Sequence, residues 1–120
     1  MDSIRSRVKV LSIKDSRIPG VKIIELEGEE LNITMDLHRE LITFREGEEL
    51  EMVTSKNLPK YKDGVDLCAR GVVVSIKDKD QKRIVISLWG YLVIIKPNNP
   101  SILDKLDLKP SDEIYYCLIK

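Results

Sequence analysis

The stretch L-N-I-T-M-D-L-H at residues 31–38 decides the fold class. Its odd-numbered residues are large and apolar, and its even-numbered residues are polar or charged. Successive side chains of a β-strand point to opposite faces, so this alternation indicates a strand with one buried and one exposed face.

Similar runs follow one another along the rest of the chain, and turn-forming Pro, Gly, Asn and Asp residues lie between them. We expect strands over residues 4–14, 21–27, 31–38, 49–55, 65–77, 83–88, 91–95 and 113–119. Residues 39–44 read as a short irregular crossover, residues 56–64 as a long mobile loop, and residues 101–106 as one helical turn. Gly71 lies inside an expected strand and predicts a bulge or a sharp bend there. The sequence therefore predicts an all-β fold: a small closed or nearly closed barrel of about eight short antiparallel strands, forming one domain over residues 1–120.

The composition supports a β-rich protein and bounds its function. The 120 residues include one alanine against 15 isoleucines and 10 valines, and β-branched residues favour strands. Lys plus Arg number 20, as do Asp plus Glu, and this zero net charge argues against a free nucleic-acid or membrane-surface binder. The chain has no apolar run of about 18 residues and no apolar leader, so we expect a soluble, cytoplasmic protein. One glutamine beside many Lys, Glu and Ile residues is typical of proteins from hot environments.

The residues that could carry chemistry are few and scattered. Cys68 and Cys117 lie 49 positions apart and form no C-x-x-C motif, which excludes a zinc knuckle. In a reducing cytosol we expect two buried thiols, with a disulfide as the alternative. His38, the single histidine, is expected at the surface without a chemical role. No nucleophile and base can be paired, so we expect no enzymatic activity, no metal and no cofactor.

Two groups of glutamates stand out in the first half of the chain. Paired carboxylates can bind metals or transfer protons, but these groups fall near expected turns, where solvated glutamates are ordinary. We therefore expect them to be solvated surface residues. The groups are Glu25, Glu27, Glu29 and Glu30, and Glu46, Glu48, Glu49 and Glu51.

Several stretches resemble one known family. The sequence I-T-M-D-L-H-R-E-L at residues 33–41 resembles the L-T-L-D-I-N-x-E-L stretch of the eighth subunit of DNA-directed RNA polymerase. Residues 50–55 resemble the strand that follows it. V-D-L-C-A-R-G at residues 65–71 is similar to the family's Y-D-Y-V-M-Y-G, with the glycine in register. S-L-W-G-Y-L-V-I-I at residues 87–95 resembles S-F-G-G-L-L-M-R-L, and the end of the chain, residues 113–120, resembles A-Y-L-L-I-R-[RK].

This resemblance covers nearly the whole chain and carries definite implications. It implies a barrel related to the oligonucleotide-binding fold. It also implies a non-catalytic polymerase subunit, bound mainly to the largest subunit on the outside of the enzyme, away from the active site. The short loop over residues 56–64, where eukaryotic members carry a long insertion, fits the archaeal form. The catalytic magnesium belongs to other chains, so no metal, cofactor or small-molecule substrate is expected here.

For the polymerase interface, the candidate residues are Arg70, Trp89, Gly90 and Tyr91. Tryptophan and tyrosine are common interface anchors, and a glycine between them lets a partner backbone approach. Arg70 lies among small and apolar residues of an expected strand and could form a charged contact. The alternatives are that Trp89 closes one end of the barrel and that Arg70 is a solvated edge charge.

A second function remains open from the sequence: a free-standing barrel that binds single-stranded nucleic acid. Its bases would stack on aromatic rings interleaved with lysines. Tyr115 and Tyr116 must point to opposite faces of a strand, so one of them belongs to the core. The zero net charge disfavours this function, because its affinity would come from neutralised phosphates. We therefore expect at most weak or indirect DNA or RNA contact. The candidate stacking residues are Tyr61, Trp89, Tyr91, Tyr115 and Tyr116.

Overall fold

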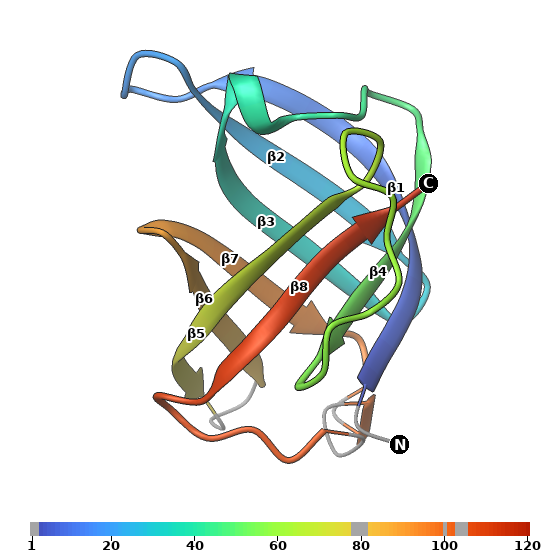
Figure 1. Cartoon of the computed structure of the whole chain (residues 1–120), viewed down its shortest axis with the longest axis vertical. Coiled ribbons are helices and arrows are strands. Elements are labelled where there is room, and N and C mark those ends of the chain that lie inside the picture. Colours follow the sequence, from blue (N-terminus) through green and yellow to red (C-terminus); the bar gives the residue numbers. More distant parts are fainter. Residues whose placement is uncertain (1–2, 78–81, 100, 103–105) are drawn as a thin grey trace.

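Eight antiparallel strands close into a barrel in the computed structural model, which describes residues 3–77, 82–99, 101–102 and 106–120. The strands are β1 (Ser3–Asp15), β2 (Val21–Gly28), β3 (Leu31–His38), β4 (Glu49–Ser55), β5 (Leu67–Lys77), β6 (Arg83–Leu88), β7 (Tyr91–Pro97) and β8 (Glu113–Ile119). A short 3-10 helix, η1 (Arg39–Leu41), follows β3. Around the barrel the order is β1-β2-β3-β7-β6-β5-β8-β4, and β4 pairs back to β1 (Figure 1). The all-β barrel prediction is confirmed, and the arrangement is consistent with a relative of the oligonucleotide-binding fold.

Alternation of burial along the strands builds the core. In β3, the four apolar residues at odd positions point inward and are at most 1% exposed, as the sequence predicts. Tyr116 of β8 also points inward, and its hydroxyl donates to the Met35 sulfur at 3.3 Å. Complete burial raises the pKa of the Tyr116 phenol above its usual range. Of the tyrosine pair, Tyr116 is therefore the core residue, whereas Tyr115 stays half-buried on the outer side.

The predicted boundaries agree closely with the structure at β3, β4, β6 and β8, which have the predicted bounds. β5 begins two residues later than expected, because a turn precedes it. The backbone N–H groups of Val65 and Asp66 both donate to the Lys62 carbonyl oxygen, at 3.1 and 2.8 Å. The expected helical turn over residues 101–106 falls partly on residues 103–105, which lie outside the described part of the chain.

The bulge predicted at Gly71 lies elsewhere. The register of β5 against β6 shifts between Val73 and Ser75, so the bulged residue is the intervening valine. Gly71 itself keeps regular pairing, and it serves another purpose. A Cβ atom at this position would stand 2.8 Å from the Ser87 carbonyl oxygen and 2.7 Å from a Leu88 methyl carbon. A glycine is needed here because β6 packs directly against this point of β5.

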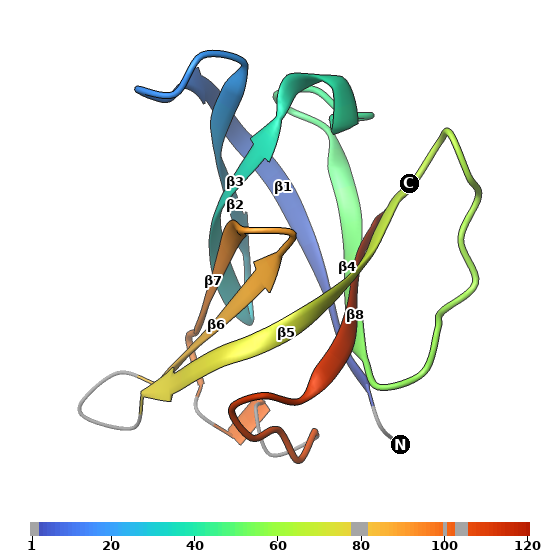
Figure 2. The same ribbon diagram turned by 60° about the vertical axis from the view of Figure 1, so that its left-hand side comes forward.

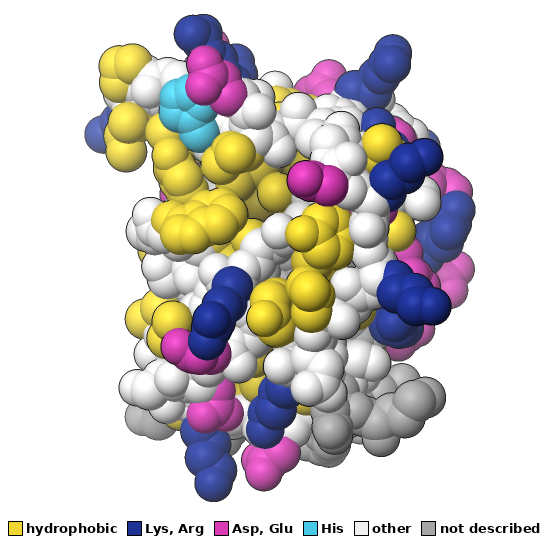
Figure 3. Space-filling view, viewed as in Figure 1, with side chains coloured by type: hydrophobic (Ala, Val, Ile, Leu, Met, Phe, Trp, Pro, Cys, Tyr) yellow, Lys and Arg dark blue, Asp and Glu magenta, His cyan; other side chains and the backbone are white. Residues whose placement is uncertain are grey.

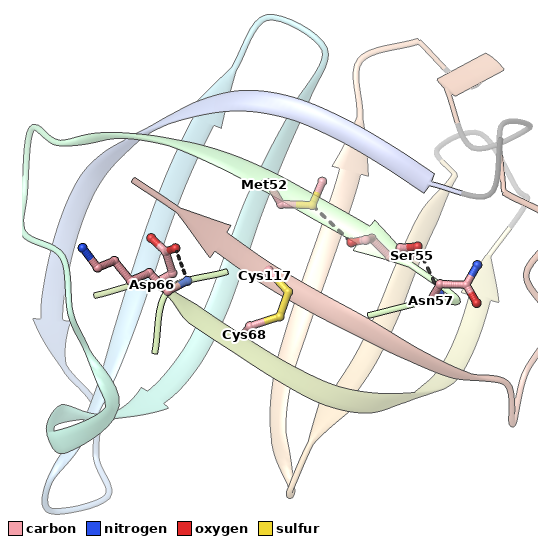
Figure 4. Close-up of a disulfide and its surroundings, with 8 residues drawn as sticks. Met52, Ser55, Asn57, Asp66, Cys68 and Cys117 are labelled. Carbon is pink, nitrogen blue, oxygen red and sulfur yellow. Dashed lines mark hydrogen bonds between the residues drawn. A yellow bond between two sulfur atoms is a disulfide. The ribbon is translucent and has the colours of Figure 1, made fainter. Parts of the chain in front are cut away.

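Cys68 and Cys117 form a disulfide, so the expectation of two free thiols is wrong (Figure 4). The two residues are far apart in the sequence, but β5 and β8 are neighbours and their register places the cysteines directly opposite each other. The argument from a reducing cytosol also has a known exception in intracellular proteins of hyperthermophiles. The disulfide links β5 covalently to β8.

The loop between β4 and β5 lies on the outer side of the barrel next to β8 (Figure 2). Leu58 and Pro59 line a groove there together with Ile119 of β8. At the end of the loop, the Asp66 carboxylate accepts hydrogen bonds from the backbone N–H groups of Lys62 and Lys120, at 2.8 and 2.9 Å. These bonds tie the loop to the last residue of the chain.

Candidate interaction surface

Trp89 and Gly90 form the two-residue turn between β6 and β7. Both have positive φ angles, 55° for Trp89 and 94° for Gly90. The pairing of Leu88 with Tyr91 closes the hairpin, and the Ser87 hydroxyl oxygen accepts a hydrogen bond from the Gly90 N–H at 3.1 Å. Two-residue hairpin turns with positive φ at both positions favour Asn-Gly, Asp-Gly or Gly-Gly. Tryptophan at the first position is therefore unusual for this turn.

The Trp89 side chain is 65% exposed, more than any other large hydrophobic side chain in the described part of the chain. A bulky residue in the left-handed region costs about 1–2 kcal/mol relative to its ordinary backbone conformation. Because the ring is mostly exposed, its burial offsets little of this cost. The exposure also shows that Trp89 does not close the barrel end, so that alternative is wrong. Backbone strain of this kind is found preferentially at functional sites. The fold by itself gives no reason for a tryptophan at this place.

Tyr91 and Arg70, the other two candidates, lie near this turn in different roles. Tyr91 is half-buried and packs against the core, so it anchors the start of β7. Arg70 lies on the outer side of β5. Two residues further along β5, Val72 is paired with Ser87 of β6, and Trp89 follows Ser87 by two residues. Arg70 is exposed and forms an ion pair with Glu113 of β8, which raises the pKa of its guanidinium. The structure thus brings Arg70, Trp89 and Gly90 to the same end of the β5–β6 pair.

The sequence analysis missed the aliphatic residues that extend this surface. Outward-pointing positions of β5, β6 and β7 carry aliphatic side chains, of which three are more than 40% exposed. A signal for them was present in the sequence: the V-V-V run of β5 and the L-V-I-I run of β7 are apolar on both faces of a strand. Such runs are typical of strands covered on both sides. We define the apolar face as Val72 and Val74 of β5, Val85 of β6, and Leu92 and Ile94 of β7.

The opposite part of the barrel has a very different outer side. Arg5 and Arg7 of β1 form ion pairs with Glu51 and Glu49 of β4, at 3.2 and 3.6 Å. Lys9 stands opposite Glu49 and also opposite Glu27 of β2. In Figure 3, Lys, Arg, Asp and Glu side chains are interleaved at the right, over β1 and β4, whereas hydrophobic side chains gather at the centre and upper left. We define the charged face as Arg5, Arg7, Lys9, Glu25, Glu27, Glu49 and Glu51.

The glutamates and the histidine have structural positions. Half of the eight clustered glutamates lie on the outer sides of β2 and β4 themselves, rather than in the turns near these strands. The His38 Nδ1 atom accepts a hydrogen bond from the Glu40 N–H at 3.2 Å, which caps η1. Within the described ranges, no group of three or more His, Cys, Asp or Glu residues could hold a metal ion. No helix in those ranges is long and apolar enough to span a membrane.

Comparison with known proteins connects the chain to transcription. Residues 3–120 match the family described as the G subunit of DNA-directed RNA polymerase. The DNA-directed RNA polymerase subunit Rpo8 of Sulfolobus acidocaldarius is 30% identical over 115 residues, covering 93% of each chain. Its counterparts from Saccharolobus shibatae and Saccharolobus solfataricus are 30% and 26% identical, each match covering 93% of this chain and 89% of the relative.

A likeness to a solved structure is much weaker. The cytoplasmic molybdate-binding protein ModG, with molybdate bound, has a TM-score of 0.36 and 14% identity to this chain. The match covers 97% of this chain and 89% of that one. A likeness at this level carries no argument about ligands or function.

Proposed function

The chain belongs to the archaeal family of the G subunit of DNA-directed RNA polymerase, also named Rpo8, and from this premise we propose that it binds the largest polymerase subunit. In this role it is a non-catalytic subunit that helps the enzyme to assemble and to stay assembled. The proposal treats residues 1–120 as one domain and places it in the cytoplasm with the rest of the polymerase. Family membership also favours this role over that of a free-standing single-strand-binding barrel.

The observation that carries the proposal is the exposed Trp89 beside the apolar face. Val72, Val74 and Leu92 are 42%, 51% and 41% exposed, and Trp89 is 65% exposed. Fully burying one Val or Leu side chain is worth about 1.5–3 kcal/mol, and tryptophan is enriched among the residues that dominate interfaces. Burial of this surface against a partner therefore stabilises the complex relative to the free, solvated subunit.

The four residues singled out from the sequence take separate roles in this proposal. Trp89 is the anchor that enters the partner. Gly90 leaves room for the partner backbone, because a Cβ at this position would meet nothing within 4 Å. Tyr91 holds the turn against the core, and Arg70 contributes a charge at the edge, shared with Glu113.

A matched pair of variants tests the proposal. Val74 and Leu11 are both 51% exposed, and each occupies the position where its strand's register shifts. Val74 belongs to the apolar face, whereas Leu11 lies on β1. We expect Val74→Gln to weaken binding to the purified largest subunit about tenfold, and Leu11→Gln to change it less than twofold. Binding is measured by titration of labelled chain at one salt concentration. Equal effects of the two substitutions, or no effect of either, would contradict docking through the apolar face.

A further inference from the structure

The three strands of the apolar face contain no carboxylate. The sequences of β5, β6 and β7 are L-C-A-R-G-V-V-V-S-I-K, R-I-V-I-S-L and Y-L-V-I-I-K-P, with four cations and no Asp or Glu. The chain as a whole balances 20 cations with 20 acidic residues, so this local imbalance is not a matter of composition. Within these three strands the charged positions are therefore all cationic.

Cations stand side by side at the end of the apolar face opposite Trp89. Ile84 of β6 is paired with Ile95 of β7. Arg83 precedes Ile84 and Lys96 follows Ile95, so the two cations are neighbours across the strands. On β5, Lys77 stands opposite Arg83, and on β3, Asn32 stands opposite Lys96. Neither Arg83 nor Lys96 stands directly opposite a carboxylate; the first one in this row is Glu27 of β2, on the far side of Asn32. Like charges facing each other across strands destabilise a sheet, so the isolated barrel bears a cost here.

Arg83 and Lys96 have unused capacity for an anion. Neither forms an ion pair with another described residue, in contrast to Arg5 and Arg7 of the charged face. The Arg83 Nε atom is buried and has no hydrogen-bond acceptor among the described residues. Arginine binds carboxylates through paired, charge-assisted hydrogen bonds, and no described residue supplies such a carboxylate to Arg83.

The two cations are continuous with the apolar face. Val85 and Ile94 are paired with each other on β6 and β7, two positions along the strands from Arg83 and Lys96 and on the same outer side. A single bound segment can therefore cover aliphatic side chains and reach both cations. Aliphatic side chains also distinguish partners, because single-stranded nucleic acids are bound by aromatic rings on which bases stack.

We propose that Arg83 and Lys96 bind one or more carboxylates of an apolar protein segment whose aliphatic side chains cover Val85 and Ile94. This inference rests on the proposed function and deepens it, because it gives the chemistry of the partner surface: apolar, with Asp or Glu at the end away from Trp89. The complementary charges orient the subunit on its partner, since only one direction of docking brings the carboxylates to the cations.

Charge-removing variants on the two faces test this inference. The double variant Arg83→Gln, Lys96→Gln removes two cations beside the apolar face, and Arg7→Gln, Lys9→Gln removes two from the charged face. Each is titrated against polymerase lacking this subunit at several NaCl concentrations. We expect the first variant to bind about tenfold more weakly at low salt and to lose much of the salt dependence of wild type. The second is expected to bind within twofold of wild type. Thermal unfolding of both variants confirms that they are folded.

The outcomes separate this inference from the proposed function. If the Arg83, Lys96 variant binds like wild type while Val74→Gln binds weakly, the docking face stands and the acidic partner is wrong. If both bind like wild type, both proposals fail. A third titration uses a fluorescent single-stranded oligonucleotide. Loss of oligonucleotide binding in the Arg83, Lys96 variant, with unchanged binding to polymerase, would overturn the inference in favour of a phosphate-binding site.

Discussion

The charged face and the apolar face are built from the same strand geometry but differ in polarity. The charged face presents paired ionic side chains to water, and the apolar face presents aliphatic ones. On β1 and β4, each outward Arg finds a Glu on the neighbouring strand, and the charges remain solvated. On β5 and β7, outward positions carry valine, leucine and isoleucine, and no carboxylate is present on β5, β6 or β7. Both faces cover the same kind of core, so the needs of the core do not explain the difference. The proposed docking of a partner on the apolar face would account for the difference, because large exposed apolar patches mark interaction sites.

The disulfide lies at the seam between the two halves, because it ties β5 of the apolar face to β8, the neighbour of β4. Removing it with Cys68→Ala, Cys117→Ala is expected to lower the free energy of unfolding by about 4 kcal/mol, since the bond closes a long loop in the unfolded chain. The measurement is urea denaturation followed by far-ultraviolet circular dichroism, with wild type under dithiothreitol as a parallel sample. An unchanged denaturation midpoint in both samples would show that the bond contributes nothing to stability.

Two glycines allow the same perturbation on each side of the barrel. A Cβ at Gly71 would press on Ser87 and Leu88 below the apolar face, and a Cβ at Gly28 would press on the Arg7 carbonyl oxygen on the charged side. We expect Gly71→Ala and Gly28→Ala each to cost about 1–3 kcal/mol of stability by overpacking. At a temperature where both are folded, only Gly71→Ala should also weaken binding to polymerase, because it displaces β6 from β5. Weakened binding in both variants, to the same degree, would remove the distinction between the faces.

The smallest effect is expected on the charged face itself. Exposed ion pairs contribute little to stability, so Arg7→Gln, Glu49→Gln should change the free energy of unfolding by no more than about 0.5 kcal/mol. Binding to polymerase should stay within twofold of wild type. These two values come from urea denaturation and from the titration used for Val74→Gln. A large loss of binding would identify the charged face as the docking surface and refute docking through the apolar face.

Much of the barrel could be predicted from the sequence, because alternation reports directly on which side of a strand is buried. The run over residues 31–38 has its predicted bounds as β3, and one of the adjacent residues Tyr115 and Tyr116 is in the core, as alternation requires; the structure shows that it is Tyr116. The sequence left the disulfide only as an alternative, because the pairing of β5 with β8 that brings the two cysteines together depends on closure of the barrel. A glycine inside a strand predicts a bulge or a sharp bend, but the register shift lies between Val73 and Ser75, and close packing between strands explains Gly71.

The candidate surface was predicted in part. Trp89 and Gly90 were singled out as interface residues, and the structure places them together in an exposed turn. The apolar face was missed because runs such as V-V-V in β5 fit either a buried strand or a strand whose outer side is covered by a partner. Only the register across β5, β6 and β7 shows that these residues share one outer surface. The neighbouring cations Arg83 and Lys96 likewise lie far from Arg70 in the sequence and join the surface through the β6–β7 pairing.

The substitution Trp89→Asn tests the central claim most directly, because folding and docking should respond in opposite directions. Asn-Gly is the favoured sequence for this turn, so the isolated chain should unfold at the same temperature as wild type or at a higher one. Binding to the largest polymerase subunit should fall at least about tenfold, since the exposed anchor is lost. A variant that binds as tightly as wild type would contradict docking through Trp89 and the apolar face. A clear loss of thermal stability would show instead that the tryptophan serves the fold.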